Sequence, residues 1–112
     1  MSDLDAQMQE WEYRATQAQA RGAHALARLL AIAEHQHGGQ ARRVAWFLAS
    51  LYDNAVLLDP FDLRAVDVVI SDDMLACLDT LRWAKADPCD LVPDGQARLR
   101  RLIERYGLNG GA

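Results

Sequence analysis

The feature that most constrains the fold is a run of apolar residues with helical spacing near the middle of the chain. Five side chains follow one another at intervals of three or four residues: Val44, Phe47, Leu48, Leu51 and Ala55. This spacing places them on one face of an α-helix and does not match the alternation of a half-buried strand. We therefore predict a core helix over residues 40–54, with Trp46 and Tyr52 at the edges of its buried face.

Similar stripes predict two helices before this segment. The first is an amphipathic helix over residues 1–21, which begins near Asp3 with Ser2 as its N-cap. Its apolar stripe is narrow: Leu4, Met8, Trp11, Ala15 and Ala18. A stronger stripe follows and ends at the glycine pair 38–39, since glycine readily adopts the left-handed conformation that ends helices. Gly22, between the two stripes, allows a kink but does not require a break, because glycine lowers helix stability by only about 1 kcal/mol relative to alanine.

After this core helix, aspartate and proline residues mark where helices end and begin. Asp59–Pro60 ends the preceding element, because proline disfavours the α conformation of the residue before it. We expect Asp62 to cap a short helix and Ser71 to cap a longer one. The longer helix is expected to bury three leucines: Leu75, Leu78 and Leu81. A β-branched cluster within residues 66–70 leaves a strand as the alternative there.

The last predicted helix is capped by Asp94 and ends at Gly107. Its stripe is again helical: Leu99, Leu102, Ile103 and Tyr106. Alanine and leucine far outnumber the β-branched residues, which lose side-chain freedom in helices. We predict an all-α fold, a single compact bundle of five or six helices. The one domain, residues 1–112, divides into an amphipathic N-terminal helix (1–21), a core (23–106) and a frayed tail (107–112).

The charge balance narrows the classes of function. A formal net charge of -4 speaks against a protein that coats nucleic acid, which needs a basic surface. The longest mostly apolar run, residues 44–52, is too short to cross a bilayer, and the first residues are acidic rather than basic. We expect a cytoplasmic protein without membrane contact, whose Cys77 and Cys89 are reduced.

The strongest charge feature is an excess of aspartate in the middle of the chain. Between residues 53 and 79 the only base is Arg64. Some of these aspartates are expected to serve helix starts or a solvated face, but together they also offer an acidic surface to a basic protein or nucleoprotein complex. The candidate partner-binding residues are Asp59, Asp62, Asp67, Asp72, Asp73, Asp79 and Trp83. Tryptophan is included because it is enriched at binding hot spots.

Catalytic motifs are missing from the sequence. It holds no phosphate-binding loop, dinucleotide fingerprint or nucleophile elbow, and nothing beside the aspartates binds a substrate for acid–base catalysis. Glu34 lies between histidines, but His35 and His37 point about 200° apart on a helix and cannot share a metal there. We therefore predict no enzymatic activity, no cofactor and no metal site.

Three segments carry a resemblance to other proteins: GQARRVAWFLASLY, FDLRAVD and DDMLACL. With the residues around them, from about 24 to 84, they resemble a family of small uncharacterised proteins carried on bacterial plasmids and integrative conjugative elements. The resemblance implies an accessory protein of a mobile element, such as a regulator, a maintenance factor or an inhibitor of host defence.

These observations lead to two functional hypotheses. The first is a non-enzymatic protein-interaction module that uses its acidic surface, in its sharpest form as an inhibitor of a host nucleic-acid-binding or defence complex such as a CRISPR effector. The alternative is a dimeric DNA-binding regulator or plasmid-maintenance factor with arginine-rich helices, because arginine forks match phosphate geometry. Its candidate residues are Arg42, Arg43, Arg98 and Arg101. Direct nucleic-acid binding is the weaker hypothesis, and the N-terminal helix offers a surface for a homodimer.

Overall fold

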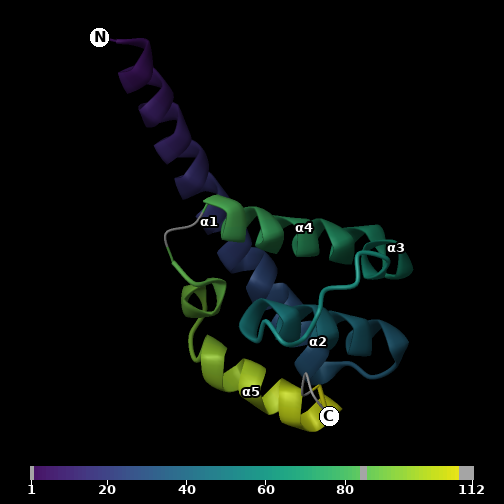
Figure 1. The fold of residues 1–112 in the computed structure, drawn as a ribbon. Coiled ribbons are helices and arrows are strands. Elements are labelled where there is room, and N and C mark those ends of the chain that lie inside the picture. The colour runs from purple at the N-terminus through teal and green to yellow at the C-terminus, as the bar shows by residue number, and fades with distance from the viewer. Residues whose placement is uncertain (1, 84–85, 109–112) are drawn as a thin grey trace.

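The computed structural model describes residues 2–83 and 86–108, and within these ranges it contains helices and no strand. The elements in chain order are α1 (Asp3–His35), α2 (Gly39–Tyr52), α3 (Asp62–Ala65), α4 (Val68–Trp83), the 3₁₀ helix η1 (Pro88–Leu91) and α5 (Gly95–Tyr106). The prediction of an all-α bundle is confirmed (Figure 1). The alternative strand within residues 66–70 is wrong, because α4 begins there.

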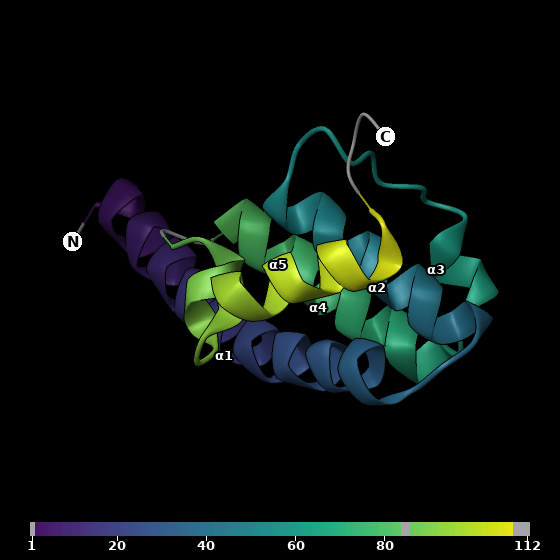
Figure 2. The same ribbon diagram turned by 90° about the horizontal axis from the view of Figure 1, so that it is seen from below.

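Helix α1 is the longest helix, and the other helices pack against its C-terminal half (Figures 1 and 2). Helix α4 runs antiparallel to it, so that Asp73 meets Arg28 and Trp83 meets Arg14. The buried face of α1 consists of Ala18, Gly22, Ala25, Leu26, Leu29, Leu30 and Ala33. The N-terminal half of α1 projects beyond the bundle and gives the molecule its extents of 53 × 26 × 24 Å.

One continuous helix replaces the two that we expected, so Gly22 does not break α1. A Cβ atom at Gly22 would lie 1.7 Å from Oγ1 of Thr80 on α4. The Thr80 hydroxyl is buried and donates to the carbonyl of Ala18 at 2.9 Å. Glycine is therefore required by the close approach of two helices.

The predicted N-cap of α1 is confirmed, since the amide of Asp5 donates to Ser2 Oγ at 3.2 Å.

The core helices follow the predicted stripes, with a difference at one end. Helix α2 buries Val44, Phe47 and Leu48, and α5 buries Leu99, Leu102 and Ile103. Helix α2 ends at Tyr52, before Ala55, which is exposed. The amide of Ala55 donates instead to the carboxylate of Asp53 at 2.9 Å, a local turn that competes with the helix.

The predicted start of α4 is wrong, and its predicted buried face is wrong at Leu75 and Leu81, whereas Leu78 is partly buried against the core. The helix begins three residues before Ser71, whose hydroxyl donates to the carbonyl of Val68, and Asp72 lies outside the first turn. The buried side chains are Ile70, Asp73, Met74, Cys77 and Thr80. Leu75 and Leu81 are about half exposed. Similarly, Asp62 lies in the first turn of α3 and is not its N-cap.

The C-terminal part of the chain differs from the predicted frayed tail. Asp94 occupies the N-cap position of α5 in the left-handed conformation, and its side chain caps no amide. Gly107 ends the helix at φ 66°, as predicted, and Leu108 is then buried, with its amide donating to Ile103 at 2.9 Å. Residues 109–112 of the predicted tail lie outside the described residues. Among the described helices, none combines the length and hydropathy needed to span a bilayer.

Candidate functional site

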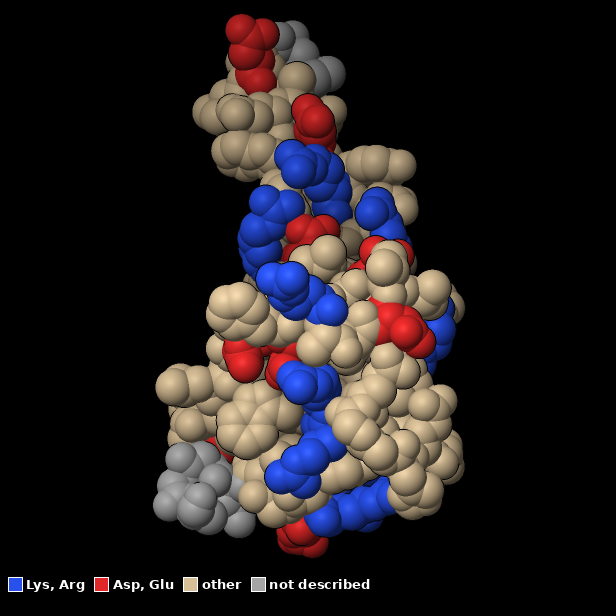
Figure 3. Space-filling model, turned by 90° about the vertical axis from the view of Figure 1, so that its right-hand side faces the viewer, with Lys and Arg blue, Asp and Glu red and all other residues tan. Residues whose placement is uncertain are grey.

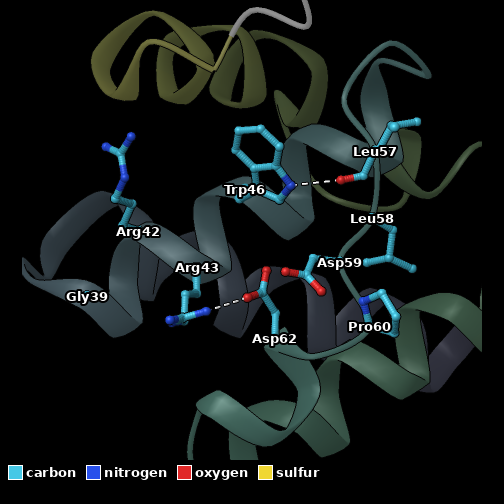
Figure 4. A pocket seen from close by; sticks show the side chains of 9 residues that line it. All are labelled: Gly39, Arg42, Arg43, Trp46, Leu57, Leu58, Asp59, Pro60 and Asp62. Atoms are coloured by element: carbon cyan, nitrogen blue, oxygen red, sulfur yellow. Dashed lines mark hydrogen bonds and ion pairs between the residues drawn. The ribbon is translucent and has the colours of Figure 1, made fainter.

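A groove with a volume of about 540 Å³ lies between α2 and the loop that leads to α3 (Figure 4). It is lined by Gly39, Arg42, Arg43, Trp46, Leu57, Leu58, Asp59, Pro60 and Asp62. These residues come from two segments that follow one another in the chain and fold back to form the two walls.

Two local interactions hold the loop wall of the groove in place. The indole Nε1 of Trp46 donates to the carbonyl of Leu57 at 2.8 Å, which ties the loop to the middle of α2. The carboxylate of Asp59 accepts from the amide of Phe61 at 3.0 Å, so that the chain turns at Pro60 into α3. The loop is thus fastened on both sides of Leu58, and it presents apolar side chains to solvent: 75% of Leu57 and 39% of Leu58 are exposed.

Some charged groups of the groove form an ion pair with each other, and others do not. Arg43 Nη1 donates to Asp62 Oδ1 at 2.6 Å, and Asp62 is only 5% exposed, so this pair forms a neutral part of the lining. Arg42 is exposed and extends away from the pair in Figure 4. The groove therefore offers an apolar wall, the guanidinium of Arg42, which makes no ion pair with a described residue, and the partly engaged carboxylate of Asp59.

The structure distributes the predicted acidic residues instead of gathering them into one free surface. Three of them pair with arginines: Asp62 with Arg43, Asp73 with Arg28 and Asp79 with Arg82. The Asp73 pair is bidentate, with distances of 2.9 and 2.8 Å. A contiguous acidic surface is therefore not supported, because these carboxylates are neutralised within the fold.

The other predicted acids lie apart from one another. Asp59 lines the groove, the exposed Asp67 accepts a hydrogen bond from Gln40, and Asp72 lines a separate hollow on α4. On the face drawn in Figure 3, basic side chains run down the middle and acidic ones are scattered beside them, so no acidic patch forms there. Trp83 lies outside the groove, between the guanidinium of Arg14 at 4.5 Å and that of Arg82 at 4.9 Å from its ring centroid.

The predicted nucleic-acid-binding arginines are also divided. Arg98 makes a bidentate contact with Glu34 at 2.9 and 2.6 Å, which lowers the pKa of the Glu34 carboxyl. Arg43 is paired as well. Among the described residues, the members of this set without an ion pair are therefore Arg42 and Arg101, on α2 and α5.

The remaining titratable groups form no second site in the described part of the chain. Cys77 and Cys89 are buried free thiols, and burial raises the pKa of each to about 12. Nδ1 of His37 lies 3.3 Å from Arg105 Nη2. Over residues 2–83 and 86–108, no three histidine, cysteine or acidic side chains are placed to hold a metal ion together.

Comparison with known proteins assigns a family. Residues 23–107 match the profile of a family of unknown function, DUF7673. The chain belongs to this family. The search of curated proteins and the search of solved structures each found no match. The family match contains the whole groove and leaves out the projecting half of α1.

Sequence reasoning missed the groove as a site, although it named four of its residues as candidates for other sites. Arg42 and Arg43 were candidates for phosphate contacts, and Asp59 and Asp62 for an acidic surface. The available signal was apolar: Leu57, Leu58 and Phe61 are large side chains in a segment that proline and aspartate keep out of a helix.

Proposed function

We propose that this member of the family is a non-enzymatic protein-interaction module and that the groove between α2 and α3 receives a segment of a partner protein. The observation that carries the proposal is the exposure of Leu57 and Leu58 on a loop that is tied to Trp46. Large apolar side chains that are exposed together mark interaction surfaces, and a preformed loop loses little entropy on binding.

The lining defines the chemistry of the segment that fits. An apolar side chain of the partner packs against Trp46, Leu58 and Pro60. An acidic side chain on one side of it pairs with the exposed guanidinium of Arg42. On the other side, a basic side chain or a backbone amide of the partner donates a hydrogen bond to the carboxylate of Asp59, which can accept more than the one bond it receives from Phe61.

We keep the proposal of a basic partner, but with fewer acidic residues to bind it. The carboxylates that support it are Asp59, Asp67 and Asp72, which make no ion pair among the described residues. We further propose that the partner is a host nucleic-acid-binding or defence complex, that the gene belongs to a mobile element and that the protein acts in the cytoplasm. These proposals are supported by the charge pattern and the sequence resemblance. Replacing Asp67 and Asp72 with lysine tests the attraction of a basic partner separately from docking in the groove, because neither residue lines the groove.

The groove is tested by removing its exposed apolar side chains. Wild-type protein and the variant Leu57→Ala/Leu58→Ala are used as baits for affinity purification from the native host, with mass spectrometry as the readout. The matched control is Val68→Ala/Val69→Ala, which removes side chains that are 74% and 72% exposed at the start of α4. We expect a specific partner to be captured by the wild type and the control and lost with the groove variant. Equal capture by all three baits would exclude the groove as the docking surface.

A further inference from the structure

A small hollow, separate from the groove, lies where the end of α4 meets α1. Its volume is about 180 Å³, and its lining residues are Tyr13, Arg14, Gln17, Arg21, Asp79 and Trp83. The first four belong to α1 and the last two to α4, and none of them lines the groove between α2 and α3. Figure 3 shows basic side chains gathered below the projecting end of α1. The hollow therefore has a chemistry of its own.

Positive charge predominates around this hollow. Arg14 and Arg21 form no ion pair with a described residue. The carboxylate of Asp79 is already engaged, because Nη2 of Arg82 donates to its Oδ1 at 2.7 Å. Three arginines and one aspartate leave a formal excess of two positive charges. Since like charges repel, an anion that binds beside Arg14 and Arg21 lowers the electrostatic energy of the hollow.

The guanidinium of Arg14 is held in place in a way that leaves its donors available. Its central carbon lies 4.5 Å from the ring centroid of Trp83. Stacking on a ring uses the flat face of a guanidinium, and the N–H groups around its edge can still donate hydrogen bonds. The half-buried amide of Gln17, one helical turn further along α1, adds another donor. Together these groups suit an anion with several acceptor oxygens.

Charge and volume indicate which anion fits. A phosphate monoester carries about -1.5 to -2 charges and three acceptor oxygens, so it matches two guanidiniums better than a carboxylate with a single charge does. The volume of 180 Å³ equals that of about six water molecules in the liquid, which admits a phosphate group but not a whole nucleotide. The remainder of the ligand therefore lies at the rim, where the ring of Tyr13 is 65% exposed. Exposed aromatic rings beside cationic side chains bind nucleobases by stacking.

From the two guanidiniums without an ion pair among the described residues and the exposed ring beside them, we propose that the hollow binds the phosphate monoester of a mononucleotide. The phosphate accepts hydrogen bonds from Arg14, Arg21 and Gln17, and the base lies on the ring of Tyr13. This ligand site is independent of the groove and goes beyond the proposed docking of a partner protein.

Two acidic side chains limit the affinity of the site. Asp79 lies in the hollow itself, and Glu10 lies one helical turn before Arg14 without lining the hollow. Both lower the positive potential that the phosphate meets. Because the arginines are also exposed to solvent, salt screens their attraction for the ligand. Binding is therefore weak and decreases as the ionic strength rises.

Isothermal titration calorimetry of the full chain with adenosine monophosphate, at low ionic strength, tests the site. The variant Arg14→Gln/Arg21→Gln should raise the dissociation constant at least tenfold, because two charge-assisted contacts are lost. The matched control is Arg42→Gln/Arg101→Gln, which removes the same charge from two exposed arginines without an ion pair among the described residues. The control should bind like the wild type. Glutamine is a good helix former, and circular dichroism checks that both variants stay helical.

Further ligands and one further variant identify the carrier of the phosphate. Tyr13→Ala should weaken adenosine monophosphate several-fold and leave inorganic phosphate unaffected, since only the base contacts the ring. Adenosine, which has no phosphate, should not bind. Equal affinity for adenosine monophosphate and inorganic phosphate, or tighter binding of a phosphoserine peptide, would overturn the nucleotide.

The site itself would be overturned if adenosine monophosphate did not bind to the wild type, or if the two arginine variants weakened its binding equally. The groove variant Leu57→Ala/Leu58→Ala should bind adenosine monophosphate like the wild type. Failure of the proposed function is thus scored separately from failure of the nucleotide site.

Discussion

Replacing Gly22 with alanine tests how α1 and α4 fit together. In an isolated helix the change is favourable, because alanine stabilises a helix interior by about 1 kcal/mol relative to glycine. In the folded protein the added Cβ would lie 1.7 Å from Thr80 Oγ1 and 2.8 Å from Thr80 Cβ. Thr80 cannot rotate without cost, since its buried hydroxyl lies 2.9 Å from the carbonyl oxygens of both Ala18 and Ala76, between which its one proton is shared.

The two effects have opposite signs, and their sizes decide the outcome. Overpacking of a close-fitting core costs about 1–3 kcal/mol, and the upper value applies here because two helices must separate to relieve the contact. Subtracting the gain in helix propensity leaves a loss of about 2 kcal/mol in the free energy of unfolding. For a domain of this size, the loss lowers the melting temperature by roughly 10 °C.

Urea and thermal unfolding, followed by circular dichroism, measure this loss. Ala20→Gly, at an exposed position of α1, is the control for propensity alone and should cost about 1 kcal/mol. In the double variant Gly22→Ala/Thr80→Ala, the total loss should be smaller than the sum of the single losses, since the hydroxyl that the new Cβ would meet is absent. A Gly22→Ala protein as stable as the wild type would refute the close approach of α1 and α4.

Three further predictions concern paired and buried groups. Asp73→Ala should lower the free energy of unfolding by about 2 kcal/mol, because it removes a bidentate contact to Arg28, whereas Asp79→Ala should cost no more than about 0.5 kcal/mol since its pair with Arg82 is exposed. Cys77 and Cys89 should resist alkylation at neutral pH in the native state and react after unfolding, as judged by mass spectrometry, because burial raises the pKa of each thiol to about 12. Arg98 lowers the pKa of Glu34, so the stabilising contribution of this pair is complete above the ordinary value of 4.5 and is lost as the pH falls through the lower native value. Glu34→Gln should therefore flatten the decrease in stability over that acidic range in urea titrations, and an unchanged pH profile would contradict this.

The apolar spacing was sufficient to predict the helices that pack by one face only. Helices α2 and α5 each have a single apolar stripe, and most of the predicted residues are buried: Val44, Phe47 and Leu48 on α2, and Leu99, Leu102 and Ile103 on α5. In α4 the apolar residues surround the helix, so spacing alone does not select the buried face. Partners distant in sequence select it: Thr80 fits against Gly22, and Asp73 receives Arg28 across 45 residues.

The same reason explains why the aspartates were misjudged as a surface. Sequence shows the local excess of acid, but two of the compensating arginines, Arg28 and Arg43, lie on other elements, and Arg82 follows the acidic segment on α4. Arg43 is 19 residues away from Asp62, and its contact leaves that carboxylate buried and neutralised. The groove was hidden for a related reason, since it depends on the hydrogen bond that joins Trp46 to Leu57 across a loop.

The position of the groove within the family match bears on how widely its role is shared. The match covers residues 23–107 and contains the whole groove. A binding role shared by the family would therefore reside in the groove.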